Sequence, residues 1–343
     1  MRAVALERFG EPLVVKREVP VPEPGPGEAL VRVLAAGVCG TDVKLWRGDL
    51  PGTPLPLVPG HEAAGVVETR GRNGTGPEQG TRVVVFHHLH CGECPRCLAG
   101  SENLCDRLRG RVGFDHDGGW ADYLVVPTRN LLPIPEGISV RQACVVPDAV
   151  ATVWRAVVRI GAVAAGEGVA VVGAGGLGLA ACQIARSHGA EVLAIDVSEA
   201  KLEQAAEAGA HHTALPDRAG EAARALPDGA PQLVVDCAGT PGAIAVATAL
   251  LPRGGRLVQV GYSRSSRLEV PAADVALKEL KILGCRASSL RDLEAALDAV
   301  ARGIVRPAIG AVRPLEEAQA ALDALVQGAA AGRQVLAVSG EDA

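Results

Sequence analysis

Two patterns of hydrophobic and polar residues divide this chain. Up to about residue 145, short apolar and β-branched runs alternate with segments rich in glycine and proline, a pattern typical of strands and turns. We expect short strands between Met1 and Val15 and longer strands over Ala29–Ala36, Ala63–Thr69 and Thr81–Phe86. The first part of the chain is therefore predicted to be an irregular β domain.

From Glu167 onward, strands alternate with amphipathic helices of about ten residues, which predicts βαβ units and a parallel sheet. The apolar run Gly168–Gly173 is the first strand, and Leu179–His188 is the first helix. The later predicted elements are strands Glu191–Ile195, Gln232–Cys237, Gly255–Val260 and Gln334–Val338, and helices Glu199–Ala208, Pro241–Leu250, Leu290–Ala301 and Leu315–Gln327.

Length and composition fit an ordinary globular protein of two domains. The chain has 343 residues, 48% hydrophobic residues and a net charge of −5. A negative net charge does not favour binding to nucleic acid or to an anionic membrane, so we expect neither as a partner. No apolar run approaches the roughly 18 residues of a membrane span, and no secretory signal follows Met1. We therefore expect a cytoplasmic protein.

Four cysteines, Cys91, Cys94, Cys97 and Cys105, lie within 15 positions. Four thiolates at such spacing can surround one tetrahedral zinc ion at about 2.3 Å, and a site closed by four protein ligands is structural. A disulfide cluster is the alternative, but cytosolic thiols stay reduced. The spacing therefore favours a structural zinc.

A glycine motif follows the first strand of the βαβ region. It consists of Gly173, Ala174, Gly175, Gly176, Leu177 and Gly178. Its position between a strand and a helix is that of a loop that binds the pyrophosphate of a dinucleotide. Asp196 ends the next strand, where an acid takes the adenosine ribose hydroxyls. Lys201 can also reach the ribose, although a solvated surface lysine is an equal interpretation.

A third group of reactive residues comes early, in Cys39-Gly40-Thr41-Asp42 and Pro59-Gly60-His61-Glu62. A catalytic zinc needs about three protein ligands and an open position. Cys39 and His61 are 22 residues apart, so only the fold can bring them together. Taken alone, His61 is more simply a loop histidine.

Together, C-G-T-D followed by P-G-H-E, the four-cysteine lobe and the glycine motif resemble the zinc-dependent alcohol dehydrogenases of the medium-chain dehydrogenase/reductase superfamily. The resemblance covers essentially the whole chain. It implies an α/β fold in which a Rossmann doubly wound parallel sheet over 148–285 accompanies a β-rich GroES-like catalytic domain. That domain would comprise 1–147, with the lobe at 88–106, and 286–343.

The resemblance implies Cys39, His61 and Asp148 as ligands of a catalytic zinc, with Glu62 beside the metal as an exchanging carboxylate. Asp148 follows a proline, so it is also interpretable as a turn carboxylate. In that case Glu62 is the alternative that completes the site.

The same resemblance assigns roles around the substrate and the cofactor. Thr41 corresponds to the hydroxyl that hydrogen-bonds the substrate oxygen, and Asp42 to the carboxylate that orients the metal-bound histidine. Thr152 is expected against the nicotinamide, and Arg333 near the cofactor phosphates.

Two positions depart from the family pattern. Lys44 stands where many relatives carry a histidine that ends a proton relay. His87 stands where relatives often have an apolar pocket residue, which indicates a polar substrate.

The implied activity is reversible hydride transfer between an alcohol and NAD, with two zinc ions per chain. Polyols, amino alcohols, secondary alcohols and cyclic hydroxyacyl thioesters are all substrate classes of relatives, and a homo-oligomer, tetramer or dimer, is expected. Two alternatives remain: a zinc-free quinone or enoyl reductase of the same superfamily, and a zinc-stabilised protein that senses NAD(H) without turnover. Loss of a catalytic ligand would favour the latter, and none is visibly lost.

Overall fold

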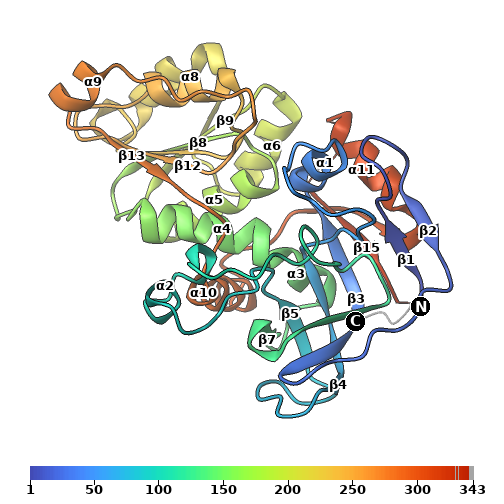
Figure 1. Cartoon of the computed structure of the whole chain (residues 1–343). Coiled ribbons are helices and arrows are strands. Elements are labelled where there is room, and N and C mark those ends of the chain that lie inside the picture. The colour runs from blue at the N-terminus through green and yellow to red at the C-terminus, as the bar shows by residue number, and fades with distance from the viewer. Residues whose placement is uncertain (329, 331, 340–343) are drawn as a thin grey trace. The chain divides into compact units, whose positions relative to one another are not determined.

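The computed structural model describes residues 1–328, 330 and 332–339. The chain divides into two compact units (Figure 1). Unit 1 comprises residues 1–148, 289–301 and 309–343, and unit 2 comprises residues 149–288 and 302–308. Both cores consist mainly of alanine, valine, leucine and isoleucine, as the aromatic content of 2% requires.

Unit 1 is built on a seven-stranded sheet in which β14-β15-β3-β4-β5-β7 follow one another and β6 also pairs with β3. β1 and β2 form a separate two-stranded sheet. The strands of this unit are β1 (Ala3–Ala5), β2 (Val14–Lys16), β3 (Glu28–Val38), β4 (Ala63–Arg70), β5 (Arg82–Val85), β6 (Tyr123–Pro127), β7 (Leu131–Pro133), β14 (Ile309–Pro314) and β15 (Arg333–Ala337).

Three of these strands bring their ends to one edge of the sheet. β3 runs antiparallel to both β4 and β15, so the end of β3 lies beside the start of β4 and the start of β15. Ala36 pairs with Ala63, and Val38 pairs with Gln334. The residues next to these pairs supply Cys39, Glu62 and Arg333 to the candidate metal site described below.

Unit 2 holds a six-stranded sheet that is parallel throughout, in the order β10-β9-β8-β11-β12-β13. This order, with the first strand at the centre, is that of the Rossmann doubly wound fold. Its strands are β8 (Gly168–Val172), β9 (Glu191–Ile195), β10 (His212–Ala214), β11 (Leu233–Asp236), β12 (Arg256–Gln259) and β13 (Lys281–Gly284). The predicted fold class is confirmed.

Helices connect these strands. They are α1 (Gly40–Trp46), α2 (Pro95–Leu98), α3 (Val140–Val145), α4 (Ala151–Trp154), α5 (Gly176–Ser187), α6 (Glu199–Glu207), α7 (Ala219–Ala222), α8 (Pro241–Ala249), α9 (Ala272–Leu277), α10 (Leu290–Ala301) and α11 (Ala318–Val326). Figure 1 shows α5 and α8 on opposite faces of the six-stranded sheet. None of the helices among the described residues is long and apolar enough to cross a bilayer.

Several helix ends follow from local sequence. Thr240 caps α8 by accepting a hydrogen bond from the N–H of Ala243, and Pro241 occupies the first helical turn, where its missing N–H does no harm. Ser139 and Gln142 form a capping box at the start of α3. π-Helical turns over Val146–Val150 and Arg155–Ile160 flank α4.

The structure also departs from the predicted elements. α5 begins at Gly176, inside the glycine motif, rather than at Leu179, because the motif supplies the first helical turn. β10 and β13 have no counterpart among the predicted strands. Both are short, and each is a strand because it pairs with β9 or β12 at the sides of the sheet.

Candidate metal and cofactor sites

The first candidate site begins at the amino end of α1. Cys39 is the N-cap of this helix, and its Sγ accepts a hydrogen bond from the N–H of Thr41 at 3.4 Å. Asp42 completes a capping box, because its Oδ2 accepts from the N–H of Cys39 at 2.7 Å. Its other oxygen, Oδ1, lies 3.2 Å from Nδ1 of His61. Asp42 therefore fixes both the helix end and the orientation of the His61 ring.

Cys39, His61 and Asp148 come together in unit 1. Oδ2 of Asp148 lies 3.3 Å from Sγ of Cys39 and 3.8 Å from Nε2 of His61. With Glu62, these residues offer four donor atoms that all lie within 4.8 Å of one another. Asp148 reaches the site from the π-helical turn Val146–Val150, so its place is set by helix geometry rather than by a tight turn.

Glu62 is completely buried beside this group, at 0% exposure. Its carboxylate lies over the backbone of Gly37 in β3, where an added Cβ would be 1.8 Å from Oε2. Oε1 lies 3.0 Å from Nη2 of Arg333, and the same nitrogen lies 3.0 Å from Oδ2 of Asp148. The distance between Arg333 and Glu62 is that of an ion pair, but the angles at these atoms do not meet those of a hydrogen bond. One guanidinium thus contacts two carboxylates, and its single positive charge can offset only one negative charge.

Burial and charge shift the protonation of these groups in different directions. Burial raises the pKa of Glu62 well above its ordinary value, although Arg333 opposes the shift. Burial would also raise the pKa of Asp148, but the hydrogen bond to His61 and the charge of Arg333 hold it well below its ordinary value. Burial would lower the pKa of His61, but the charge of Asp42 and the hydrogen bond to Asp148 raise it. The site therefore keeps Asp148 ionised.

This donor set fits a zinc ion. Zinc takes thiolate, imidazole and carboxylate ligands at about 2.0–2.3 Å in a tetrahedron, whose edges are then about 3.3–3.8 Å. Oδ2 of Asp148 lies 3.3 Å from Sγ of Cys39 and 3.8 Å from Nε2 of His61, which are the two limits of this range. In addition, neither oxygen of Glu62 makes a hydrogen bond among the described residues, and the ion pair with Arg333 accounts for Oε1 alone.

The structure places the remaining predicted site residues around this group. Oγ1 of Thr41 lies 3.6 Å from Sγ of Cys39. Lys44, in α1, is half-buried, and burial lowers its pKa. The ring of His87 is buried, and its centroid lies 5.7 Å from that of the His61 ring. The ring of Phe114 packs against His61 with a centroid distance of 4.7 Å. Their catalytic or substrate roles remain predictions.

Arg333 has contacts that the sequence did not indicate. Its guanidinium pairs with Glu62 and Asp148, and the expected position near the cofactor phosphates stays a prediction. The reason for these contacts is strand register: Gln334 pairs with Val38, so Arg333 comes level with the cysteine that follows Val38. A cofactor contact by the same side chain remains untested.

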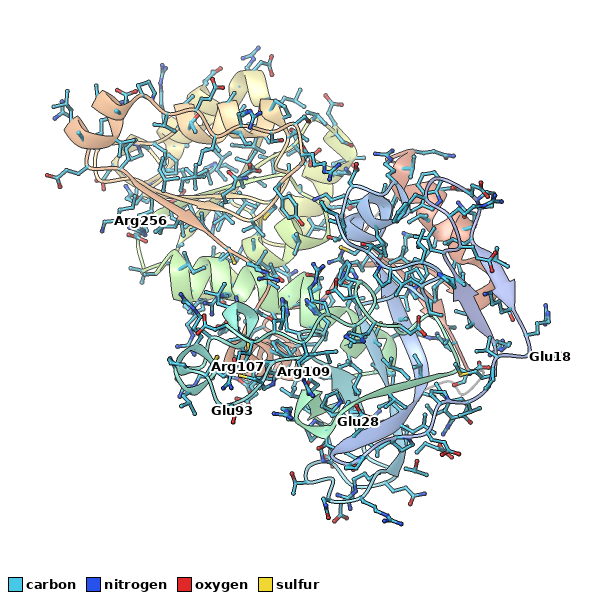
Figure 2. The ribbon with its side chains drawn as sticks, viewed as in Figure 1. Glu18, Glu28, Glu93, Arg107, Arg109 and Arg256 are labelled. Atoms are coloured by element: carbon cyan, nitrogen blue, oxygen red, sulfur yellow. The ribbon has the colours of Figure 1, made fainter. Side chains whose placement is uncertain are left out.

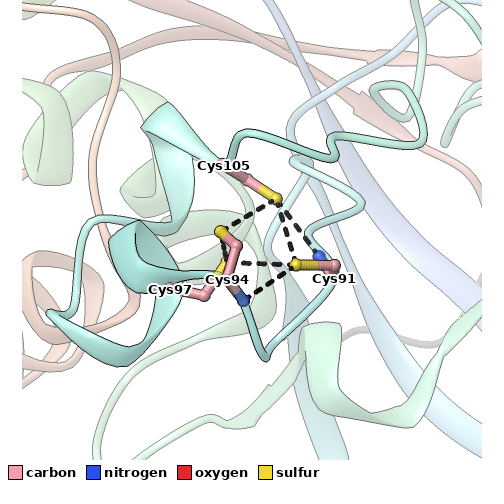
Figure 3. Close-up of side chains that lie close together, drawn as sticks. All are labelled: Cys91, Cys94, Cys97 and Cys105. Atoms are coloured by element: carbon pink, nitrogen blue, oxygen red, sulfur yellow. Dashed lines mark hydrogen bonds between the residues drawn. The ribbon is translucent and has the colours of Figure 1, made fainter.

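The four-cysteine lobe forms the second candidate metal site (Figure 3). Sγ–Sγ distances are 3.5 Å for Cys91–Cys105 and Cys94–Cys97, and 3.9 Å for Cys91–Cys97 and Cys94–Cys105. A tetrahedron with bonds of about 2.3 Å has edges of about 3.8 Å. All four cysteines are free of disulfide bonds. The lobe therefore fits a closed zinc site.

Backbone groups prepare the lobe for a cation. Hydrogen bonds from the N–H of Glu93 and from the N–H of Cys94, the latter at 3.3 Å, lower the pKa of Cys91 to about 6, whereas burial raises the pKa of Cys97 to about 12. The carboxylate of Glu102 accepts from the N–H of Leu290 at 3.2 Å and ties the lobe to the start of α10. Arg107 and Glu93 form an exposed ion pair on its surface at 3.0 Å (Figure 2), which adds little stability.

We expect Cys97→Ser to remove one of two bound zinc ions per chain. Cys97 is a buried donor of a closed site, and a hydroxyl is a much weaker zinc ligand than a thiolate. Metal analysis of the purified protein measures the loss, and the melting temperature should also fall. The control is Cys182→Ser, which changes a buried cysteine of unit 2 outside both donor sets. Two retained ions in Cys97→Ser would contradict the assignment.

The third candidate site is the glycine loop of unit 2. Gly173 follows β8 with φ of +93°, a conformation that favours glycine. Gly175 is the N-cap of α5, and Gly176 and Leu177 form its first turn. A Cβ on Gly178 would lie 1.8 Å from the carbonyl oxygen of Gly173, so this glycine permits close helix–strand packing. The loop leads into the start of α5, where the first backbone N–H groups have no acceptor within the helix, and this is the arrangement that binds pyrophosphate.

Asp196 lies beside this loop. Its Oδ2 accepts from the N–H of Ala174 at 2.7 Å, and its Oδ1 accepts from the N–H of Ser198 at 3.0 Å. Lys201 is in α6, one turn further along. Thr152 is in α4, buried, and its carbonyl oxygen accepts from Sγ of Cys285 at 3.6 Å. The predicted acid and the predicted glycine loop thus meet, while the contacts of Lys201 and Thr152 with a cofactor stay predictions.

Sequence reasoning missed Gly37 and Phe114. A glycine inside a strand is a recognised signal of close backbone approach, but the predicted strand Ala29–Ala36 stops one residue before Gly37, which lies inside β3 in the structure. Its partner could not be identified, because Glu62 lies beside it only through the β3–β4 pairing. Phe114 has no comparable signal in the sequence.

A doubly wound sheet with a glycine loop and an acid, combined with a buried Cys–His–carboxylate set and a four-cysteine lobe, defines a zinc-binding dehydrogenase. Residues 25–136 match the alcohol dehydrogenase GroES-like domain family, and residues 176–302 match the zinc-binding dehydrogenase family. An alcohol dehydrogenase of Geobacillus stearothermophilus is 37% identical over 98% of this chain and 100% of its own length.

Solved structures agree with this assignment. An NAD-dependent alcohol dehydrogenase superposes with a TM-score of 0.88 at 37% identity, over 99% of this chain and 100% of the other. A thermostable alcohol dehydrogenase from Pyrobaculum aerophilum, with cobalt and zinc bound, superposes with a TM-score of 0.90 at 32% identity. The match covers 98% of this chain and 99% of the other. The chain belongs to the zinc-dependent alcohol dehydrogenase family of the medium-chain dehydrogenase/reductase superfamily, as the sequence resemblance predicted.

Proposed function

We propose that the protein catalyses reversible hydride transfer between an alcohol and NAD, with a catalytic zinc held by Cys39, His61 and Asp148 and a structural zinc in the lobe. The observation that carries this proposal is the buried sulfur–nitrogen–oxygen donor set within 4.8 Å, in a chain that also has a dinucleotide-type glycine loop. When bound, zinc would polarise the alcohol oxygen and lower its pKa, and NAD would accept the hydride.

The chain's own residues hold and orient the reactants. Asp42 accepts a hydrogen bond from Nδ1 of His61 and leaves Nε2 to face Asp148 and the metal position. The hydroxyl of Thr41 would accept the alcohol proton and pass it outward, and its position 3.6 Å from Sγ of Cys39 supports this role. We also propose that Lys44 replaces the relay histidine of relatives, either through its lowered pKa or by holding water, and that His87 favours polar substrates.

The test is a turnover screen with NAD⁺ across polyols, amino alcohols, secondary alcohols and cyclic hydroxyacyl thioesters, accompanied by metal analysis. Turnover that is lost on chelation and restored by zinc supports the proposal. Full activity in protein with one zinc or none would refute it and favour a zinc-free reductase. NADH binding without turnover of any class would favour a redox-sensing protein.

We expect NAD to be preferred over NADP. The 2′-phosphate of NADP would bring a second negative charge beside the Asp196 carboxylate, and two like charges about 5 Å apart repel by about 3 kcal/mol at an effective dielectric of about 20. The adjacent Val197 and Ser198 supply no cation. The ratio of kcat/KM should therefore favour NAD on the order of a hundredfold.

Asp196→Ser should narrow that ratio at least about tenfold, because the charge is removed while a hydroxyl remains. Glu199→Gln, an exposed carboxylate at the start of α6, is the control and should leave it unchanged. Equal kcat/KM values for the two cofactors in the wild-type protein would overturn the assignment of Asp196.

We further propose a homo-oligomer, either a tetramer or a dimer, located in the cytoplasm. β13 is an edge strand of the parallel sheet, and Leu277 nearby is 78% exposed, which supports an interface on this side of unit 2. The nine free cysteines support a reducing compartment. Light scattering measures the oligomeric state directly.

A further inference from the structure

Asp236 is a buried carboxylate that the two metal sites and the glycine loop do not use. It ends β11 and has 0% exposure. Its Oδ1 accepts hydrogen bonds from the N–H groups of Ala238 and Gly239, both at 2.9 Å. Its Oδ2 accepts a hydrogen bond from Nε2 of Gln259 at 2.6 Å. Three of the four acceptor positions of this carboxylate are therefore engaged, two by the loop that follows β11 and one by the last residue of β12.

Gln259 makes the matching contacts from the neighbouring strand. It ends β12, and its Nε2 also donates to the carbonyl oxygen of Gly261 at 2.7 Å. The carbonyl oxygen of Asp236 in turn accepts from the N–H groups of Val260 and Gly261, at 3.0 and 2.9 Å. Side chains and backbone thus tie the two loops to each other.

Glycine packing shows how little freedom these loops have. Gly239 has φ of +65°, and a Cβ there would lie 2.1 Å from the carbonyl carbon of Gly261. A Cβ on Gly173 would lie 2.9 Å from Cβ of Ala238. The loop after β11 is therefore in contact with the glycine loop on one side and with the loop after β12 on the other.

Sheet order indicates which part of the cofactor these loops meet. β9 and β11 lie on either side of β8, so the strand order reverses there, and ligands of doubly wound sheets bind outside the strand ends at this point. Asp196, after β9, is where the adenosine ribose is expected, and the glycine loop after β8 takes the pyrophosphate. The other nucleoside then extends over the ends of β11 and β12.

We propose that the hydrogen-bonded pair of Asp236 and Gln259 positions the backbone that receives the nicotinamide half of the dinucleotide. The inference rests on the proposed NAD-linked function. The pair acts through residues 237–239 and 260–262, so both members are positioning residues rather than catalytic ones.

The experiment compares NADH with ADP, which carries only the adenosine half and a pyrophosphate. Gln259→Met keeps the length of the side chain and removes the hydrogen bond, and Asp236→Asn places two amide donors against each other. Hydrogen bonds to charged groups have effects of about tenfold on equilibria. We expect the Kd for NADH to rise about tenfold in each variant, while the Kd for ADP changes less than twofold.

The double variant, Asp236→Asn with Gln259→Met, relieves the donor conflict and should bind NADH no more weakly than Asp236→Asn alone. Gln232→Met is the matched control, because Gln232 accepts from the N–H of Gly168 at the opposite end of β8. It should leave the NADH-to-ADP ratio unchanged.

Two results would overturn the inference: equal weakening of NADH and ADP, which indicates a general effect on unit 2, or unchanged NADH affinity in Gln259→Met. The second result decides the question even if Asp236→Asn does not fold, because Gln259 is only half-buried. Failure of the proposed function gives a different result, because the wild-type protein itself would then not bind NADH.

Discussion

Asp148→Asn is expected to release the metal from the Cys39–His61 site while the four-cysteine lobe keeps its own. The carboxylate oxygen of Asp148 faces both Cys39 and His61, and an amide brings no negative charge and a poorer zinc ligand. Loss of even an outer-shell partner lowers metal affinity about 10–100-fold, so loss of a ligand should lower it by about a hundredfold or more. Competition with a chelator and metal analysis measure the two sites separately.

Two further variants make this expectation specific. Asp148→Cys should keep the metal, because a thiolate has the same formal charge and is a strong zinc ligand. Asp122→Asn is the control. This carboxylate forms an ion pair with Arg2 at 2.8 Å and belongs to neither donor set. Wild-type zinc affinity in Asp148→Ala would show that Glu62, rather than Asp148, completes the site.

Arg333→Met should destabilise the metal-free protein by about 3–5 kcal/mol, the range found when one partner of a buried ion pair is removed. The Arg333 side chain is 8% exposed, and it is within 3.0 Å of two carboxylates, one of them fully buried. Urea unfolding of the metal-free and zinc-loaded proteins tests this. The loss should be smaller with zinc, because a cation then neutralises part of the same charge.

The control for this prediction is Arg2→Met. Arg2 also contacts two carboxylates, those of Asp122 and Glu316, but its side chain is 35% exposed. Its removal should change the free energy of unfolding by about 1 kcal/mol or less. The loss of unfolding free energy in Arg333→Lys should lie between those of Arg333→Met and Arg2→Met, because lysine keeps the charge but lacks the planar guanidinium that contacts two carboxylates. Similar small effects for Arg333→Met and Arg2→Met would contradict the role of Arg333.

The parts of the molecule that could be predicted from sequence are those whose partners are close along the chain. The lobe cysteines lie within 15 positions, and the glycine motif and Asp196 belong to one βαβ unit. Hydrophobic periodicity also located β9 and α10 with the bounds that the structure shows. In each case the interaction that defines the element is local.

The candidate metal site at Cys39, His61 and Asp148 is different, because its residues are far apart in sequence. Asp148 meets Cys39 across 109 residues, and Arg333 meets Asp148 across 185. Only the resemblance to a family indicated Asp148, and nothing in the sequence indicated that Arg333 pairs with Glu62 and Asp148. The position of Arg333 depends on the pairing of β15 with β3, and strand pairing over such distances leaves no local signal.

The contact between Gly37 and Glu62 implies a rule for sequence divergence. The glutamate occupies the volume that any side chain at position 37 would need, so the two positions exclude each other sterically. A lineage can acquire alanine or a larger residue at position 37 only after position 62 has become smaller. Across many homologous sequences, these two sites should therefore coevolve, with glycine accompanying every glutamate.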